Sequence, residues 1–474
     1  MLLGINNQKI VIKYGGSSQS THDIVAKTID INSKLLLKEN HIIEVVSAPG
    51  KSKEYPEKLT NLAIAEFKKY TSTFKLSEVF LEQTNSRFCS IFCDFGIKPQ
   101  EIKKLILNTL TSRLENVISK KNTLSSRDLE KLIKAAIVSA PEEIQAKLKI
   151  QTYKLLNIPA HYLDPLNNFF CDGSPDCGFY NFSKSIEFIK TQVNQDPNSI
   201  GVRPGFQGTT NDGDISIFPR GGSDISGAID AEALNADYYF NCSDVNGVME
   251  VDPRLFEDEP KIQNKIKTIP NLSFNELEEL AITGASVIHP LAITPLRRAN
   301  IKMIVCNTFD LNSKFTTISS ERCISNNKIK GIAFLKNLGY VILHSPDMLG
   351  KPGYAQKFSD AFVEKNIDIE MIYTSPTTIV ANSKDVENLY TIEKSLSEYG
   401  KVYLGKGTSM ISIVGDGYQG NPKIAIDFLT ALAKSSSELK ILRQTQALSC
   451  SYWVSIDNKY ITQAAKETYK HFFL

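Results

Sequence analysis

A pair of glycines, Gly221 and Gly222, stands between a short alternating apolar run at 215–218 and a helix-like pattern. Ser223 and Asp224 are typical of a helix N-cap, and apolar residues then recur at helical spacing. Glycines at a helix N-terminus can present backbone N–H groups and the positive end of the helix dipole to a phosphate. For this pair alone, a tight turn that needs glycine for its backbone angles is the simpler interpretation.

The start of the chain repeats this arrangement. An alternating run at 9–14 leads into Gly15, Gly16 and Ser17, and a helical pattern follows. Lys13 lies two residues before the glycines, where a strand would carry its ammonium to the edge at which open α/β sheets bind ligands. Alone, Lys13 could be an exposed charge at the end of a strand. A second glycine turn in one chain favours phosphate binding, although neither turn has the GxxxxGK[ST] pattern.

The composition is ordinary and excludes several classes of protein. A chain of 474 residues is expected to form about three domains. The formal net charge of +2 gives no reason to expect a nucleic acid or an anionic membrane as the main partner. The N-terminal stretch is too short and polar for a signal peptide, and no run approaches the roughly 18 apolar residues of a bilayer span. The eight cysteines include no CxxC pair and suggest reduced thiols, so we expect a cytoplasmic protein.

Six short segments occur in one order along the chain, and they include both glycine turns. They are VIKYGGSS at 11–18, VVSAPGK at 45–51, PGFQG at 204–208, PRGGSDISGA at 219–228, SDVNGVMEVDPR at 243–254 and GASVIHP at 284–290. This set resembles the aspartokinases of the amino-acid kinase family over nearly the whole chain. The resemblance implies ATP-dependent phosphorylation of the L-aspartate side-chain carboxylate to 4-phospho-L-aspartate. That reaction is the first step towards lysine, threonine and methionine.

The resemblance also implies an α/β architecture. Residues 1–310 would form a catalytic domain with the amino-acid kinase fold, a mainly parallel sheet between helical layers, and 311–328 would be a linker. The segments 329–400 and 401–474 each read as a strand–helix–strand unit, an internal repeat. They would be two ferredoxin-like βαββαβ ACT domains, the second able to interleave with the first. ACT domains bind amino-acid effectors and usually pair, so a homodimer or larger assembly is expected.

The resemblance places the acceptor aspartate in the kinase domain. The implied contacts are Ser47, Thr60, Glu142, Phe206, Arg220 and Ser223. Glu142 would meet the substrate ammonium, although Pro141 stands where relatives have glycine; without the resemblance, Glu142 would read as a solvated helix residue. Arg220 suits a bidentate clamp on the α-carboxylate.

The implied ATP contacts surround the two glycine turns and a later loop. They are Lys13, Gly15, Gly16, Ser17, Gly221, Gly222, Ser243, Asp244, Met249 and Arg254. Met249 stands where tyrosine is common, and Ser286 where some relatives hold a lysine. His289 reads as structural. Mg²⁺ would arrive with ATP, because the sequence offers no protein-built metal cage.

The chemistry requires positioning and charge neutralisation rather than covalent work. The acceptor carboxylate is already ionised at pH 7, so no strong general base is needed. Lys13 would be the catalytic cation that neutralises charge on the transferred phosphoryl group. Asp224 would organise Lys13 and the glycine loop by charge-assisted hydrogen bonds.

An effector site is implied in the first ACT domain, with lysine as the expected effector. Its residues would be Met348, Gly353, Tyr354, Glu370 and Ser375. Gly353 can offer a backbone N–H to the effector carboxylate, and Glu370 can meet an ammonium. Pro376 stands where relatives usually have glutamate, and Glu370 could instead be an exposed strand residue. We therefore expect weak inhibition by lysine.

Two other functions fit the same residues. One is a related kinase that acts on another small carboxylate or a carbamate, which the substitutions at Pro141 and Met249 leave open. The other is a non-catalytic amino-acid sensor with a vestigial kinase domain. The charged set Lys13, Arg220 and Asp224 argues against the sensor, because a vestige has no reason to keep it.

Overall fold

The computed structural model describes residues 2–474 apart from 220, 283–287, 325–327 and 446–449. Among the described helices, none combines the length and the apolar character that crossing a membrane requires. The chain divides into two compact units. The first comprises Met1–Val248, Thr268–Phe274 and Ser286–Arg322, and the second Met249–Lys267, Asn275–Ala285 and Cys323–Leu474.

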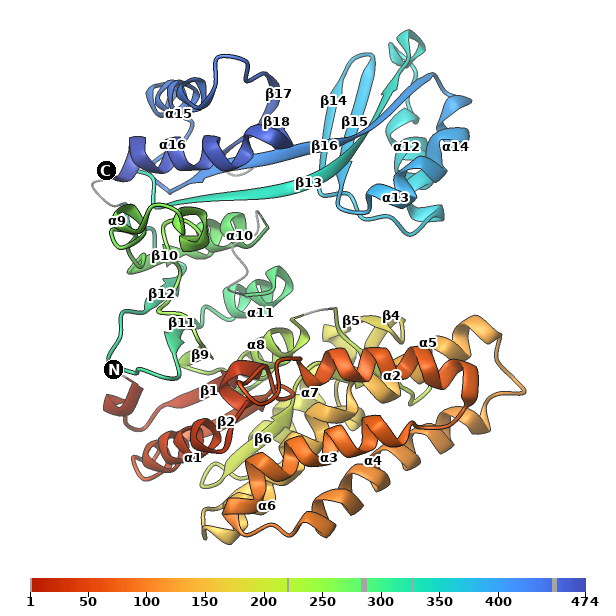
Figure 1. The fold of residues 1–474 in the computed structure, drawn as a ribbon, viewed down its shortest axis with the longest axis vertical. Coiled ribbons are helices and arrows are strands. Elements are labelled where there is room, and N and C mark those ends of the chain that lie inside the picture. Colours follow the sequence, from red (N-terminus) through yellow and green to blue (C-terminus); the bar gives the residue numbers. More distant parts are fainter. Residues whose placement is uncertain (1, 220, 283–287, 325–327, 446–449) are drawn as a thin grey trace. The chain divides into compact units, whose positions relative to one another are not determined.

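The first unit is built on an eight-stranded sheet in the order β10-β12-β11-β9-β1-β2-β6-β3 (Figure 1). Its strands are β1 (Lys9–Tyr14), β2 (His41–Val46), β3 (Ala160–Tyr162), β6 (Ile200–Pro204), β9 (Tyr238–Ser243), β10 (Asn271–Ser273), β11 (Lys302–Asn307) and β12 (Thr316–Ser319). Neighbouring strands are parallel except β11 and β12. The expected mainly parallel sheet is confirmed. The expected linker 311–328 is not free of structure, because β12 pairs within this sheet.

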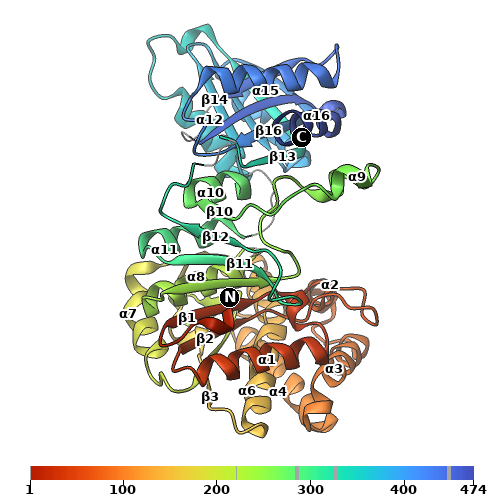
Figure 2. The same ribbon diagram turned by 90° about the vertical axis from the view of Figure 1, so that its left-hand side faces the viewer.

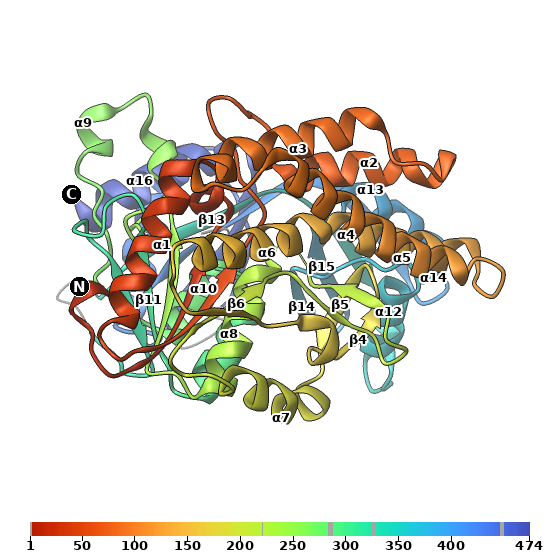
Figure 3. The same ribbon diagram turned by 90° about the horizontal axis from the view of Figure 1, so that it is seen from below.

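Helices cover both faces of the sheet (Figure 3). One group shares a single apolar core with β1, β2, β6 and β9. Its helices are α1 (His22–Leu36), α2 (Leu59–Thr73), α3 (Glu78–Phe92), α4 (Pro99–Ser119), α5 (Ser126–Val138) and α6 (Ala140–Leu155). On the other face α8 (Gly222–Leu234) packs on β1 and β2 and is flanked by α7 (Phe182–Val193) and α11 (Ile293–Arg298).

Two antiparallel ribbons stand apart from the main sheet. They are β4 (Cys171–Ser174) with β5 (Cys177–Tyr180), and β7 (Gln207–Thr209) with β8 (Ile215–Ile217). The apolar run before Gly221 is therefore a strand, as predicted, but it belongs to a ribbon. Only the first of the two glycine turns follows a strand of the main sheet.

The second unit holds a six-stranded antiparallel sheet in the order β14-β15-β13-β16-β18-β17. Its strands are β13 (Gly331–His344), β14 (Met371–Ser375), β15 (Thr378–Ser383), β16 (Lys401–Val414), β17 (Ile441–Thr445) and β18 (Ser451–Asp457). Its helices after residue 330 are α12 (Tyr354–Glu364), α13 (Val386–Leu389), α14 (Glu393–Ser397), α15 (Pro422–Ser435) and α16 (Ile461–Phe473), the last two packed side by side (Figure 2). The order β13-α12-β14-β15-α14-β16 is the expected βαββαβ pattern.

The long strands β13 and β16 run through two separate cores. Ile332, near the start of β13, packs with α15 and α16, whereas Val341 and Leu343 of the same strand pack with α12. Val402 and Leu404, near the start of β16, also lie against the α12 core. Each core therefore contains residues from both sides of residue 400. This sharing of strands β13 and β16 favours interleaved modules.

Part of the predicted kinase segment 1–310 belongs to the second unit. The residues Val251, Leu255, Phe256 and Ile266 lie in the same core as α15 and α16. The ring of Phe256 lies 5.2 Å from that of Tyr469, and Glu279 accepts a 2.8 Å hydrogen bond from the Trp453 indole. The short helices α9 (Pro260–Gln263) and α10 (Phe274–Ile282) lie in or overlap these segments. The compact units therefore do not follow the expected boundary at 310, because these apolar side chains are buried against the C-terminal elements.

Candidate active site

Lys13 is held at the carboxyl end of β1 by two polar side chains. Its Nζ lies 2.6 Å from Asp224 Oδ1 and donates to Asn241 Oδ1 at 3.2 Å. Asn241 is the register partner of Lys13 on β9, and Asp224 lies in the first turn of α8. Asp224 Oδ2 also accepts the backbone N–H of His289 at 3.1 Å. The Lys13 side chain is only 12% exposed, so its ammonium is fixed by strand, helix and loop together.

Both glycine turns are tight for steric reasons. Gly221 has φ of +85° and forms the N-cap of α8, so Ser223 and Asp224 lie inside the helix rather than capping it as predicted. A Cβ on Gly222 would lie 2.7 Å from the Phe206 ring, and one on Gly50 would lie 2.4 Å from the Gly16 carbonyl carbon. Glycine is therefore needed at these positions because other parts of the chain approach the backbone closely.

A cavity of about 660 Å³ gathers most of the predicted site. The predicted residues that line it are Lys13, Gly15, Gly16, Ser47, Thr60, Glu142, Phe206, Gly221, Gly222, Ser223 and Asp224. The N-terminal turn of α8 contributes Gly222, Ser223 and Asp224 to the wall, so the positive end of its dipole faces the cavity. The cavity is thus suited to anions.

Several charged residues of this cavity were not predicted from the sequence. They are Lys58, Lys68, Lys134 and Asp176, and Lys134 pairs with Asp176 at 2.8 Å. Each is an ordinary surface residue in sequence terms, without a motif to single it out. Asn241 carried a weak signal, a polar residue inside an otherwise apolar strand.

Glu142 is a buried carboxylate inside this cavity. Its residue is 4% exposed, and among the described residues its Oε2 has no hydrogen-bond partner. Burial raises the pKa of Glu142 to about 8, against the lowering effects of backbone hydrogen bonds and the Arg113 charge. Pro141 lies in the first turn of α6, where proline is tolerated, so its substitution for glycine leaves the helix intact. The backbone hydrogen bonds and the Arg113 charge therefore offset only part of the cost of burying this carboxylate.

The remaining predicted nucleotide contacts lie elsewhere. Ser17, Ser243 and Asp244 belong to the first unit but do not line this cavity. Met249 and Arg254 belong to the second unit, where Arg254 is exposed and pairs with Asp252 at 2.8 Å. Arg220 and Ser286 lie outside the described residues. Among the described residues no cluster of acidic, histidine or cysteine side chains could hold a metal ion.

The amino acid kinase family model matches residues 8–307, which is more than half of the chain. The chain belongs to the amino acid kinase family. Aspartokinase 3 of Bacillus subtilis is 26% identical over 471 residues, which cover 98% of each chain.

Two solved structures of an aspartokinase show a similar fold. Escherichia coli aspartokinase III in complex with aspartate and ADP covers 98% of this chain and all of its own, with 20% identity and a TM-score of 0.79. The same enzyme in complex with lysine and aspartate covers 98% of this chain and 99% of its own, with 21% identity and a TM-score of 0.68. At these identities the likeness concerns the fold.

In this amino acid kinase, the predicted effector residues all lie in the second unit. Met348 ends a short 3₁₀ turn, Gly353 has φ of +100° at the start of α12, and Tyr354 is the first residue of that helix. Ser375 ends β14, and Glu370 lies just before that strand. The Glu370 carboxylate is 2.9 Å from Lys384 Nζ, so it already has a cationic partner.

Proposed function

We propose that this chain is an aspartate kinase that transfers the γ-phosphoryl group of ATP to the side-chain carboxylate of L-aspartate. The observation that carries the proposal is one cavity lined by two different kinds of charged group. Lys13 and the N-terminus of α8 suit phosphate, and Glu142 suits an ammonium. Relatives named aspartokinases that match nearly the full length support the same substrate. The product, 4-phospho-L-aspartate, begins the synthesis of lysine, threonine and methionine.

In this proposal the acceptor lies between Glu142 and the start of α8. Glu142 holds the substrate ammonium, Arg220 clamps the α-carboxylate, and Ser47, Thr60 and Ser223 donate hydrogen bonds, while the ring of Phe206 packs against the carbon chain. The substrate carboxylate attacks without deprotonation, because it is ionised at neutral pH. The residues near the reacting group therefore act by position and charge.

The donor side uses Lys13 and the two glycine turns. Asp224 and Asn241 keep the ammonium of Lys13 directed to where the equatorial oxygens of the transferred phosphoryl group gain charge. We place the nucleotide near Gly15, Gly16, Ser17, Ser243 and Asp244 of the first unit. Mg²⁺ comes with ATP and neutralises phosphate charge. ADP bound to the Escherichia coli structure supports nucleotide use.

The Michaelis constant for aspartate should depend on pH through Glu142. The carboxyl group is largely protonated below its pKa of about 8 and must lose that proton to bind an ammonium. KM for aspartate should therefore fall as pH rises towards 8, by up to about tenfold per unit, and then level off. KM for ATP should not follow this curve. Steady-state kinetics from pH 6 to pH 9 test this, and a flat aspartate profile would contradict it.

Feedback by lysine should be weak and should pass through Glu370. Lys384 occupies the carboxylate that would hold the effector ammonium, so the effector must displace an ion pair within the chain. Glu370→Ala should abolish inhibition, whereas Lys384→Ala should lower the half-inhibitory lysine concentration by up to about fivefold, the upper range for an exposed pair. Uninhibited rates should be unchanged in both. Inhibition that survives in Glu370→Ala would place the sensor elsewhere.

The regulatory part of the proposal is an ACT pair with interleaved modules, 329–400 and 401–474, through which two copies of the chain associate. A single assay separates the candidate functions. ATP turnover is measured with a panel of amino acids, other small carboxylates and carbamate. Turnover that depends on L-aspartate supports the aspartate kinase, turnover with another acceptor supports a related kinase, and lysine binding without any turnover supports a sensor.

A further inference from the structure

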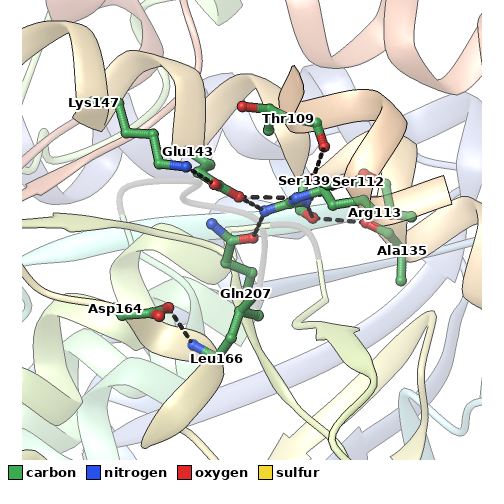
Figure 4. A network of polar contacts seen from close by, with 11 residues as sticks. Thr109, Ser112, Arg113, Ala135, Ser139, Glu143, Lys147, Asp164, Leu166 and Gln207 are labelled. Atoms are coloured by element: carbon green, nitrogen blue, oxygen red, sulfur yellow. Dashed lines mark hydrogen bonds and ion pairs between the residues drawn. The ribbon is translucent and has the colours of Figure 1, made fainter. Parts of the chain in front are cut away.

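The guanidinium of Arg113 is buried where α4, α5, α6 and β7 meet (Figure 4). Its Nε donates to Glu143 Oε2 at 2.9 Å, and Nη2 donates to the same oxygen and to Gln207 Oε1 at 2.7 Å. Nη1 donates to Ser139 Oγ at 2.6 Å and to the Ala136 carbonyl at 3.2 Å. These contacts use all of the N–H donors that a guanidinium carries.

Each side-chain partner of Arg113 is adjacent in sequence to a residue of the cavity wall. Glu143 follows Glu142 in the first turn of α6, Gln207 follows Phe206, and Ser139 follows Val138. Gln207 is also the register partner of Ile217, another wall residue. Arg113 itself does not line the cavity. Among the described residues, its side-chain hydrogen bonds reach the cavity wall through these neighbours, while its charge also acts on Glu142.

Phe206 needs such support, because its backbone is unusual. Its φ of +72° lies in the left-handed region, which costs a non-glycine residue about 1 kcal/mol or more. Its N–H donates to Ser226 Oγ at 3.1 Å, and its carbonyl accepts the N–H of Phe218 at 2.9 Å. The bond from Arg113 to Gln207 fixes the next residue. Hydrogen bonds thus fix the backbone of Phe206 and the side chain of the next residue, and the backbone in turn sets the position of the Phe206 ring.

We propose that Arg113 is a positioning residue for the acceptor end of the cavity, where it places Glu142 through Glu143 and Phe206 through Gln207. The inference rests on the proposed aspartate kinase function. A planar fork can hold a carboxylate and an amide at fixed distances, which a lysine cannot reproduce. Misplacing a substrate-holding group by about 1 Å can cost roughly 100-fold.

A buried clamp that serves only the fold is the alternative. Loss of one partner of a buried ion pair costs about 3–5 kcal/mol of stability in either case. A change in melting temperature therefore decides nothing, and the decision lies in kinetic constants. Two results would distinguish a positioning role. Substitutions of Arg113 would raise KM for aspartate but not KM for ATP, and substitutions of Arg113 and of Glu143 would move the midpoint of the pH dependence of KM for aspartate in opposite directions.

The test uses Arg113→Lys, Arg113→Met and Glu143→Gln in the full chain. Lys147→Gln is the matched control, since Lys147 is the second cation on Glu143 but contacts neither Ser139 nor Gln207. Arg113→Lys and Arg113→Met should raise KM for aspartate by roughly 10- to 100-fold and leave KM for ATP within about twofold of wild type. The control should change little, as expected for a half-exposed pair.

The pH dependence of KM for aspartate gives the second readout. Arg113→Met removes the cation that lowers the pKa of Glu142 and should move the midpoint to higher pH. Glu143→Gln removes the adjacent negative charge and should move the midpoint to lower pH, because a like charge disfavours ionisation. The other charged groups around this cavity are the same in all variants. They are Lys13, Lys58, Lys68, Lys134, Asp176 and Asp224.

Variants that melt earlier but keep the wild-type KM for aspartate and the wild-type midpoint would overturn the positioning role. If Arg113→Met does not fold, Arg113→Lys and Glu143→Gln still decide the matter. A wild-type protein that ignores aspartate would instead overturn the proposed function, and the positioning role with it. The two failures can therefore be told apart. An active wild type with variants of unchanged KM overturns only the positioning role, whereas a wild type without activity on aspartate overturns the proposed function.

Discussion

Replacing Lys13 by alanine should lower kcat by roughly 100- to 1000-fold while leaving the protein folded, the usual cost of removing one preorganised group that stabilises transition-state charge. Lys13 Nζ lies 2.6 Å from Asp224 Oδ1 and donates a hydrogen bond to Asn241 Oδ1, and these two contacts fix the ammonium at the cavity. Its role exists only during phosphoryl transfer, so KM for aspartate should change much less than kcat. Initial rates at saturating substrates measure the effect.

Lys9 provides the matched control for this substitution. It lies on the same strand at the opposite end and is exposed, and its ammonium donates to the Leu234 carbonyl at 3.3 Å. Lys9→Ala should therefore retain wild-type turnover. If Lys13→Ala kept more than about a tenth of wild-type kcat, well outside the range for such groups, Lys13 would not be the catalytic cation.

Replacing Glu142 by glutamine should weaken aspartate binding and stabilise the fold. A hydrogen bond to a charged group contributes about 1.5–3 kcal/mol, so KM for aspartate should rise roughly 10- to 150-fold. The pKa of Glu142 is raised from 4.5 to about 8, so the folded protein holds this proton more tightly than the unfolded chain does. Ionisation therefore destabilises the fold, a cost that grows between these two pH values and is complete above about 8.

Thermal unfolding at two pH values tests the stability half of this prediction. At pH 9 Glu142→Gln should melt at a higher temperature than the wild type, because glutamine carries no charge to bury. Near pH 4 both proteins are neutral at this position, so their melting temperatures should agree. A variant that is less stable at pH 9 would show that the carboxylate has a partner in the folded chain.

Much of the site could be predicted because its chemistry is encoded locally. The glycine turns, Lys13 and Asp224 stand within short motifs, and most of the residues that the resemblance implies for aspartate line one cavity. Asn241 and Arg113 could not be predicted in the same way. Their roles depend on strand register and on a junction of helices far apart in sequence, and neither belongs to a motif.

The fold shows the same contrast between local and long-range information. The resemblance implied the βαββαβ order of the second unit. The local pattern read only as strand–helix–strand and did not place β15 or the helices α13 and α14, because the two-residue turn at Pro376 ends β14 without an obvious second strand pattern. The segments around Phe256 and Glu279 were assigned to the kinase domain by their place in the chain. Their side chains are buried with Tyr469 and Trp453, contacts that no local pattern predicts.

Trapping the product with hydroxylamine tests the central claim most directly. An acyl phosphate reacts with hydroxylamine to give a hydroxamate, so the trapped compound records which carboxylate received the phosphoryl group. The purified chain is incubated with ATP, Mg²⁺, hydroxylamine and L-aspartate, and ADP and the hydroxamate are quantified by mass spectrometry. An aspartate kinase gives one hydroxamate per ADP, carried on the side-chain carboxyl group of aspartate. ADP without this compound, or a hydroxamate formed only from another acceptor, would contradict the account.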